Sequence, residues 1–376
     1  MMIETTTIFS RLDRRLQRFV RSRYSLACLL LVCVTLLQYG VGIVPREFYR
    51  VLAWDPYVDQ KEEVHKQNYF QESPLLPIVA HHLCLFSRFS FNLFCLIVIM
   101  GAYVLFAFYC QRRIEHSLAF SVFALLQAHP ATTVLLSWLG MPDCITFTLT
   151  VLALFITSLI GLIPLCILGA FNHPVALFAI PAVLVLRRLA KDKGVTWWHP
   201  VASALALGLG LLAIQVFLCV FNIKTYSRVD HALSMDLKFW INQNVSFFPM
   251  VLFSLHNIVW LAIGVCIMAA WRFNRLYFIV FALTQLGFYA ITFFCLDTTR
   301  VFSLLAWAPA VHCIIYSCRL LREQQQDVLY EQTRKLLLLL AMIGMLIPNY
   351  YVYLGIVHHP LENEFHIWSY LTSLIH

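Results

Sequence analysis

Long apolar runs without charge recur along this chain, and they constrain its fold more than any other feature. The run from Ser25 to Val44 contains no charged residue. About 20 such residues in a helix cross the ~30 Å hydrocarbon layer of a membrane. Only 12% of the residues are charged and 61% are hydrophobic, whereas soluble domains carry roughly 25% charged residues. The chain is therefore predicted to be an integral membrane protein.

The apolar runs predict an all-α, polytopic transmembrane protein with about 9–11 membrane segments, broken half-helices included. The stretch from Gly169 to Pro174 interrupts one of them, which is predicted to be a hairpin of two half-helices. The whole chain, residues 1–376, is predicted to form a single transmembrane domain. The predicted segments are residues 25–44, 90–110, 117–138, 144–160, 161–187 (interrupted), 198–220, 249–270, 276–296, 300–318 and 335–356.

Lys and Arg are concentrated in short clusters between these runs, which predicts an orientation. A cytoplasmic N-terminus places 18 of the 27 Lys and Arg residues in the cytoplasm, in agreement with the positive-inside rule. Residues 1–24 are then cytoplasmic, and residues 45–89 form a first outer loop that ends in an amphipathic stretch over 74–89. The membrane would be a bacterial inner membrane or that of the endoplasmic reticulum.

The net charge of +8 does not indicate a nucleic-acid partner, because the basic residues follow membrane topology rather than a basic helix or stripe. The twelve cysteines form no Cys-x-x-Cys pair, so no metal clasp is predicted. Phosphate-cradling glycine loops, Gly-x-Ser-x-Gly and His-Glu-x-x-His are also missing from the sequence. Nucleotide-handling and metalloprotease functions therefore have no local support.

The first outer loop offers candidate catalytic acids. Asp55 and Asp59 are four residues apart, so a helical loop would place both carboxylates on one face. A carboxylate near the membrane surface can act as a general base or bind a cation. Glu72, later in the same loop, is a candidate substrate-binding residue. The alternative is a solvated loop whose acids keep it out of the bilayer.

Asp297 and Arg300 interrupt an otherwise apolar stretch from Leu276 to Pro309. Ionisable residues at the edge of a membrane segment indicate function, because burying them is costly. The planar guanidinium of Arg300 suits a phosphate or carboxylate, and Arg228 in the predicted outer loop 221–248 is a second candidate for phosphate. The alternative is an ion pair that satisfies itself within a short turn.

Three further polar positions mark predicted breaks on the outer side: His129 before Pro130, Asp143 after Pro142, and His173 before Pro174. They are candidate substrate-binding residues. The alternative is structural, since polar side chains satisfy the backbone groups that prolines and glycines leave free. Under the predicted topology Asp143 and His173, together with Asp55, Asp59, Asp297 and Arg300, face one compartment and could share one cavity.

The pattern resembles the GT-C superfamily of polytopic glycosyltransferases, which use polyprenyl-phosphate-linked sugars. The resemblance covers mainly residues 25–190. It rests on Trp54-Asp55-Pro56, the stretch Glu72 to Pro77, the stretch His129 to Asp143, and Asn172-His173-Pro174. The turn Asp297 to Arg300 is similar in placement to late basic residues that such enzymes use near the donor phosphate.

The resemblance implies a membrane glycosyltransferase acting on the periplasmic or luminal face. The donor would be a polyprenyl-phosphate sugar, and the acceptor a glycan, lipid or protein. Asp55 would serve as general base, with Asp59 as its substitute, and Arg300 would stabilise the leaving lipid phosphate. The resemblance also implies that the stretch 74–89 is an interfacial helix. Asp55 lacks the adjacent second acid of some family members, and this leaves dependence on a divalent cation open.

Two other functions remain open at this stage. A polysaccharide polymerase would use Arg300 and Arg228 against a lipid pyrophosphate, whereas an O-acyltransferase would need a buried histidine such as His129 or His173. A transporter or flippase for a lipid-linked substrate is the third possibility. Transporters commonly show internal repeats and paired broken helices, and the sequence shows one broken segment without a detectable repeat.

Overall fold

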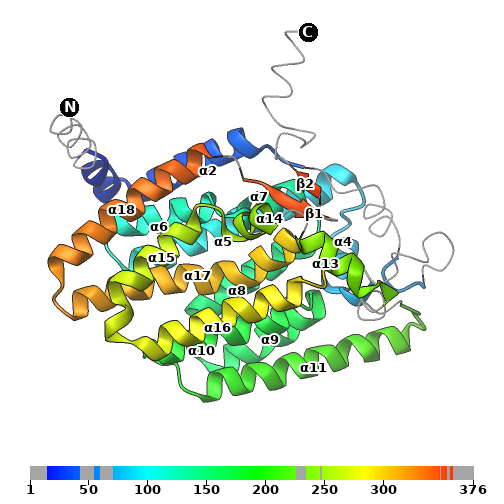
Figure 1. The fold of residues 1–376 in the computed structure, drawn as a ribbon. Coiled ribbons are helices and arrows are strands. Elements are labelled where there is room, and N and C mark those ends of the chain that lie inside the picture. Colours follow the sequence, from blue (N-terminus) through cyan, green and yellow to red (C-terminus); the bar gives the residue numbers. More distant parts are fainter. Residues whose placement is uncertain are drawn as a thin grey trace, which may run out of the picture.

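The computed structural model describes residues 15–42, 55–59, 71–225, 234–245, 248–347, 349–353 and 356–358, and these residues are almost entirely helical (Figure 1). The helices are α2 (Tyr24–Tyr39), α4 (Leu75–His82), α5 (Arg88–Arg113), α6 (His116–Gln127), α7 (Pro130–Ser137), α8 (Asp143–Phe155), α9 (Leu159–Asn172), α10 (Ala176–Leu189), α11 (Trp198–Val220), α13 (Leu237–Val245), α14 (Phe248–His256), α15 (Val259–Ala270), α16 (Arg275–Thr292), α17 (Thr298–Glu323) and α18 (Asp327–Leu346). A short antiparallel hairpin of β1 (Tyr351–Tyr353) and β2 (Ile356–His358) follows them.

Several of these helices are suited to a membrane. Within the described ranges, four helices are long and apolar enough to cross one, and the number rises to seven if each bent helix pair counts as one span. The apolar helices α8 and α9 are shorter. The predicted helical membrane protein is confirmed at this level, while the count of about 9–11 segments stays a prediction.

The central element is α17, which runs through the middle of the bundle (Figure 1). Its most apolar window is 94% buried, compared with 33–39% for the other three long spans. A helix that is apolar on every side is expected to be buried on every side, and α17 packs against α10, α15 and α16. Its two ends therefore lie where the polar groups of neighbouring helices gather.

The predicted interruption of segment 161–187 is present between α9 and α10. Pro174 lacks a backbone donor and disfavours helix at His173, which adopts an extended backbone. The ring Nδ1 of His173 accepts a hydrogen bond from the backbone N–H of Val175. The break is thus satisfied locally, as a polar interruption among apolar helices requires.

Two further bent pairs occur within the predicted segments 117–138 and 249–270, and the first coincides with the polar break predicted at His129. Helices α6 and α7 meet at 51°, and α14 and α15 meet at 72°. The first bend follows from His129, whose Nδ1 accepts from the N–H of Ala131, and from Pro130 at the first position of α7. The second contains Asn257 with a φ of 52°, a conformation that asparagine tolerates well.

The predicted boundaries are wrong at two places. The stretch 74–89 is not one helix, because α4 ends at His82 and the capping box of Ser87 and Ser90 starts α5 at Arg88. The segment 335–356 begins earlier, at Asp327, and stops at Leu346. Ile347, directly before Pro348, has an extended ψ of 124°, as the residue before a proline prefers.

Helices α9 and α11 approach each other closely at Gly210. A Cβ atom at Gly210 would lie 2.6 Å from the Cβ of Ala170 and 2.7 Å from the carbonyl oxygen of Ile167. Two residues earlier, on another side of α11, a Cβ at Gly208 would meet nothing within 4 Å. Small residues allow such backbone contact between membrane helices, where apolar side chains gain little from association.

We expect Gly210→Ala to lower the melting temperature of the purified protein in detergent, because backbone atoms must separate, at a cost of about 1–3 kcal/mol. Gly208→Ala is the matched control. It should leave the melting temperature unchanged or raise it, since alanine favours helix over glycine by about 1 kcal/mol. Equal effects of the two substitutions would contradict the packing of α9 on α11.

Candidate functional site

A buried ion cluster lies where the first turn of α17 meets the first residue of α8. The guanidinium of Arg300 donates from Nε to Asp143 Oδ2 over 2.6 Å and from Nη2 to Asp143 Oδ1 over 3.1 Å. Its Nη1 donates to Asp297 Oδ2 over 2.9 Å. We call these three residues the Arg300 cluster, and the end of the bundle that holds them the Arg300 end. The cluster brings together three of the residues predicted from the sequence.

Local sequence explains how each member is placed. Asp297 occupies the N-cap position of α17, and Arg300 follows in the first turn, three residues later. Asp143 starts α8 after the turn Gly140-Met141-Pro142, in which Gly140 has a φ of 98° that favours glycine. Both carboxylates thus sit at helix N-termini, where the helix dipole favours negative charge.

The charges of the cluster do not balance. One guanidinium faces two carboxylates, with side-chain exposures of 11% for Arg300, 2% for Asp143 and 20% for Asp297. The ring of Trp138 lies 5.5 Å from the guanidinium carbon, close enough for a cation–π contact. Arg300 is therefore held on both sides, and its two carboxylates carry one negative charge in excess when both are ionised.

Asp297 is the more labile of the two carboxylates. Its Oδ1 is buried and has no hydrogen-bond partner among the described residues, whereas both oxygens of Asp143 accept from Arg300. Burial raises the pKa of Asp297, and the charge and hydrogen bond of Arg300 only partly oppose that rise. A carboxyl group with a raised pKa is suited to exchange a proton nearer neutral pH.

Other elements close around the start of α17. The hydroxyl of Thr299 forms a 2.7 Å hydrogen bond with Ser254 of α14 and accepts from the backbone N–H of Val352 in β1. Thr298 accepts from the amide of Gln243 in α13. These contacts fix the first turn of α17, and hence Arg300, from three sides.

The α9–α10 break lies beside Asp143. The amide of Asn172 donates to the carbonyl of Pro142 over 2.7 Å and to the hydroxyl of Thr146 over 2.9 Å. Asn172 is fully buried, and His173 is 9% exposed. The structure thus joins two of the predicted polar breaks, at Asp143 and at His173, next to the cluster.

His129 belongs to a separate, directed chain of hydrogen bonds. Its Nδ1 accepts from Ala131 N–H, so its Nε2 carries the proton and donates to Nδ1 of His256 over 2.7 Å. Nε2 of His256 then donates to Oε1 of Gln285 over 3.0 Å. Both nitrogens of His129 are occupied in a buried position, so this histidine holds the α6–α7 and α14–α15 bends together. His256 and Gln285 were not predicted, because nothing in their local sequence marks them.

The acids of the predicted first outer loop, Asp55 and Asp59, occupy another region. Asp55 is exposed and accepts from the backbone N–H of Tyr57, and Asp59 is half-buried. The ring of Tyr57 lies 4.7 Å from that of Phe221 at the end of α11, and its hydroxyl contacts His82 of α4 over 2.7 Å.

Glu72 lies in the same neighbourhood, because its carboxylate accepts from Thr225, which follows α11. These acids therefore sit beside α4 and α11. Arg228, the second predicted phosphate ligand, falls outside the described residues.

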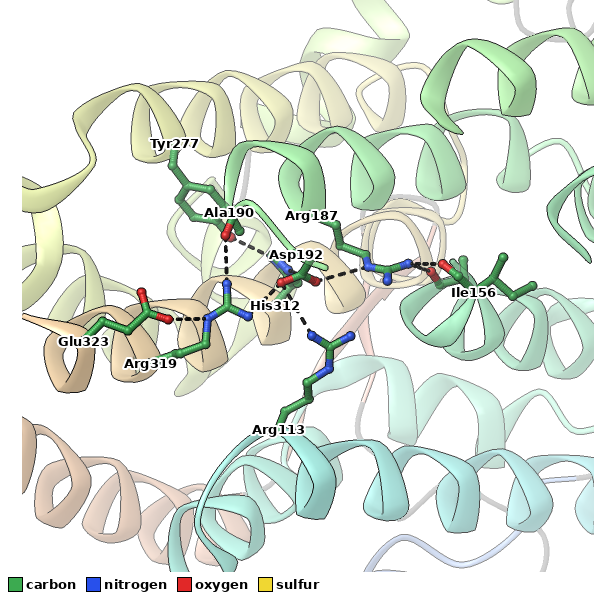
Figure 2. Close-up of polar contacts among 10 residues, drawn as sticks. Arg113, Ile156, Arg187, Ala190, Asp192, Tyr277, His312, Arg319 and Glu323 are labelled. Carbon is green, nitrogen blue, oxygen red and sulfur yellow. Dashed lines mark hydrogen bonds and ion pairs between the residues drawn. The ribbon is translucent and has the colours of Figure 1, made fainter. Parts of the chain in front are cut away.

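A second charged centre was not predicted. Asp192, in the turn after α10, lies among Arg113 of α5, Arg187 of α10 and two residues of α17, Arg319 and His312 (Figure 2). We call this group the Asp192 cluster. The Asp192 carboxylate is 1% exposed and lies 2.7 Å from Arg319 Nη1 and 3.3 Å from Arg187 Nε. In the sequence it was one acid inside a basic cluster, which gave no sign of burial.

The Asp192 cluster has a structural role, because its arginines hold the ends of neighbouring helices together. Nη1 of Arg187 donates to the carbonyls of Ala153 and Ile156 at the end of α8, and Arg319 donates to the carbonyl of Ala190 at the end of α10. Cations at helix C-termini satisfy carbonyls that have no helical partner. Burial alone would raise the pKa of Asp192, but His312, Arg319 and Arg113 hold that pKa well below its ordinary value.

In the part of the chain that the structure describes, no three His, Cys, Asp or Glu side chains come together in a way that could hold a metal ion. The two carboxylates of the Arg300 cluster are already bound to a guanidinium. No protein-family model matches the chain, and no curated protein matches it either. A functional assignment therefore rests on the residues themselves.

We expect Asp192→Asn to destabilise the protein by about 3–5 kcal/mol, because it leaves buried arginines without their counter-charge. The measurement is thermal unfolding in detergent. Because the pKa of Asp192 is lowered in the folded state, its stabilisation is present at pH 7 and is lost as pH falls below about 5. The Asn variant should lack this acid-sensitive component.

Glu323→Gln is the matched control, because Glu323 also pairs with Arg319 but is 57% exposed. Exposed pairs contribute about 0–1 kcal/mol, so its melting temperature should stay close to that of the wild type. Equal destabilisation by the two substitutions would contradict a structural role for Asp192 at the helix ends.

Proposed function

We propose that the chain is a membrane glycosyltransferase that takes a sugar from a polyprenyl-phosphate donor at the Arg300 end and transfers it to a glycan, lipid or protein acceptor. The observation that carries the proposal is the Arg300 cluster, which is mostly buried, has unbalanced charges and lies at the ends of apolar helices. Such a place can be reached both by a lipid tail within the membrane and by a polar head group. Intramembrane ionisable residues mark functional sites by default.

The cluster suggests how a donor phosphate would enter. Asp143 accepts two hydrogen bonds from Arg300 and is almost fully buried, whereas Asp297 accepts one and is more exposed. A phosphate oxygen could therefore replace Asp297 at Nη1 while Asp143 keeps the guanidinium in place. Arg300 would then stabilise the charge that develops on the lipid phosphate as it leaves.

Displacement of Asp297 leaves a carboxylate free to act as the general base. It would take the proton from the acceptor hydroxyl as the oxygen forms a bond to the sugar C1 atom. The bond between C1 and the phosphate oxygen breaks at the same time, and its electron pair leaves with the lipid phosphate. The raised pKa of Asp297 supports this role, because a base works best when its pKa approaches the working pH.

The resemblance to GT-C enzymes assigns the base to Asp55 instead, with Asp59 as its substitute. Asp55 lies in the loop that packs against α4 and the end of α11. A GT-C-like arrangement with about 9–11 membrane segments and a cytoplasmic N-terminus belongs to the same proposal. Separate substitutions of Asp55 and Asp297 decide between the two bases.

The test is sugar transfer by the purified full chain from a radiolabelled polyprenyl-phosphate sugar to added acceptors. We expect Asp297→Asn to lower the rate about 10²–10⁴-fold, as for loss of a general base, and Arg300→Gln to lower it about 10²–10³-fold. Wild-type activity should rise with pH through the raised pKa of Asp297. Asp327→Asn, an exposed acid at the start of α18, is the control and should retain the wild-type rate.

The outcome for Asp55→Asn assigns the base. If that variant alone is inactive while Asp297→Asn is active, Asp55 is the base, as the resemblance implies. Full activity in Arg300→Gln would contradict the proposed site altogether.

A transporter for a lipid-linked substrate is the second candidate, and the three bent helix pairs favour it. Movement of a fluorescent lipid-linked sugar across proteoliposomes, sensitive to Asp297→Asn and without any transfer product, would establish this function instead. A polymerase would give chains of many sugars in the transfer assay. An acyltransferase using His129 is disfavoured, because both ring nitrogens of that residue are engaged.

A further inference from the structure

A short basic helix precedes the first apolar helix and lies across its end. Residues Arg15–Ser22 meet α2 at 108°, and this helix is the dark blue segment near the N-terminus in Figure 1. Val20 is 1% exposed and Tyr24 is buried, so one face packs on the bundle. Arg15, Arg18 and Arg21 are exposed. A helix with one docked apolar face and an arginine-rich outer face is typical of segments that lie in the membrane interface.

A pocket of about 300 Å³ opens between this helix and the start of α6. Its lining contains only polar and charged side chains, namely Gln17, Arg18, Arg21, Glu115, His116 and Ser117. The pocket thus combines two guanidinium groups with further hydrogen-bonding groups.

The one acid of the pocket is already engaged. Glu115 accepts from Nη2 of Arg322 over 3.1 Å and from the hydroxyl of Ser117 over 3.1 Å. His116 is held by Gln111 and by an edge contact with the ring of Tyr24. Among the described lining residues, Arg18 and Arg21 contribute two positive charges and Glu115 contributes one negative charge, which is already paired with Arg322.

Apolar side chains are exposed on α2, the helix that follows the basic helix in the chain. Leu26, Leu29 and Leu30 are 39%, 58% and 50% exposed, and they follow directly after the helix bend. Phe19, on the basic helix, is 37% exposed. A ligand with an anionic head group and apolar chains would use both the polar pocket and the exposed leucines of α2. A free phosphate would use only the pocket.

We propose that this pocket binds the phosphate head group of an anionic glycerophospholipid, whose acyl chains lie along α2. The guanidinium forks of Arg18 and Arg21 suit phosphate oxygens. The orientation predicted from the positive charges places this end in the cytoplasm, where the leaflet carries anionic lipids. The bound lipid fixes the angle between the basic helix and α2.

The test is native mass spectrometry of the full chain in detergent, titrated separately with phosphatidylglycerol, with phosphatidylcholine of the same chain length, and with inorganic phosphate. We expect phosphatidylglycerol to bind most tightly, and the double variant Arg18→Gln/Arg21→Gln to bind it about 30-fold more weakly. The matched control is Arg272→Gln/Arg275→Gln, which removes two exposed arginines from the α15–α16 turn. It should bind within about twofold of the wild type.

A second double variant, Arg18→Lys/Arg21→Lys, keeps the charge but removes the guanidinium forks, so it should bind phosphatidylglycerol more weakly than the wild type and more tightly than the Gln variant. Equal loss in the Arg272/Arg275 control would show that the effect comes from overall charge and would overturn the site. Equal binding of phosphatidylcholine, or displacement of the lipid by an equal concentration of inorganic phosphate, would overturn the anionic phospholipid.

Discussion

The two-point contact between Arg300 and Asp143 is the interaction on which the Arg300 end of the bundle depends. It joins the first turn of α17 to the start of α8, two elements 157 residues apart in the chain. A lone charge would be very costly so close to apolar helices, and this pairing offsets that cost. Because α17 is the most buried of the four long spans and Thr146 of α8 accepts from Asn172 at the α9–α10 break, the position of Arg300 fixes much of what surrounds it.

The Asp192 cluster has the corresponding place at the other end of α17. Arg300 and Arg319 lie on the same helix, separated by roughly 28 Å at 1.5 Å per residue. That distance is close to the ~30 Å thickness of the hydrocarbon layer.

The two ends of α17 nevertheless differ in charge. The Asp192 cluster has more cations than acids and caps helix C-termini, whereas the Arg300 cluster has more acids than cations and sits at helix N-termini. Only the latter leaves a buried carboxylate oxygen without a partner among the described residues.

Much of this architecture could be predicted from the sequence, because hydrophobic length and proline act locally. The apolar runs predicted the helices, and Pro174 predicted the break between α9 and α10. Where a boundary depended on a cap, as at Ser87, or on the residue before Pro348, the predicted ends were wrong. The pairing of Asp143 with Arg300 and the burial of Asp192 arise from contacts between distant elements, and no local pattern encodes them. Hydropathy therefore identified candidate residues, while only the fold could show which of them meet.

We propose that Arg300 exchanges Asp297 for a lipid phosphate while Asp143 stays bound. The most direct test is an experimental structure of the full chain with a polyprenyl phosphate, determined by electron cryomicroscopy in a lipid nanodisc. In that structure we expect a phosphate oxygen within hydrogen-bonding distance of Arg300 Nη1. The contact between Arg300 and Asp143 should be unchanged, and Asp297 should be turned away from the guanidinium. A phosphate bound elsewhere, with Asp297 still on Arg300, would contradict it.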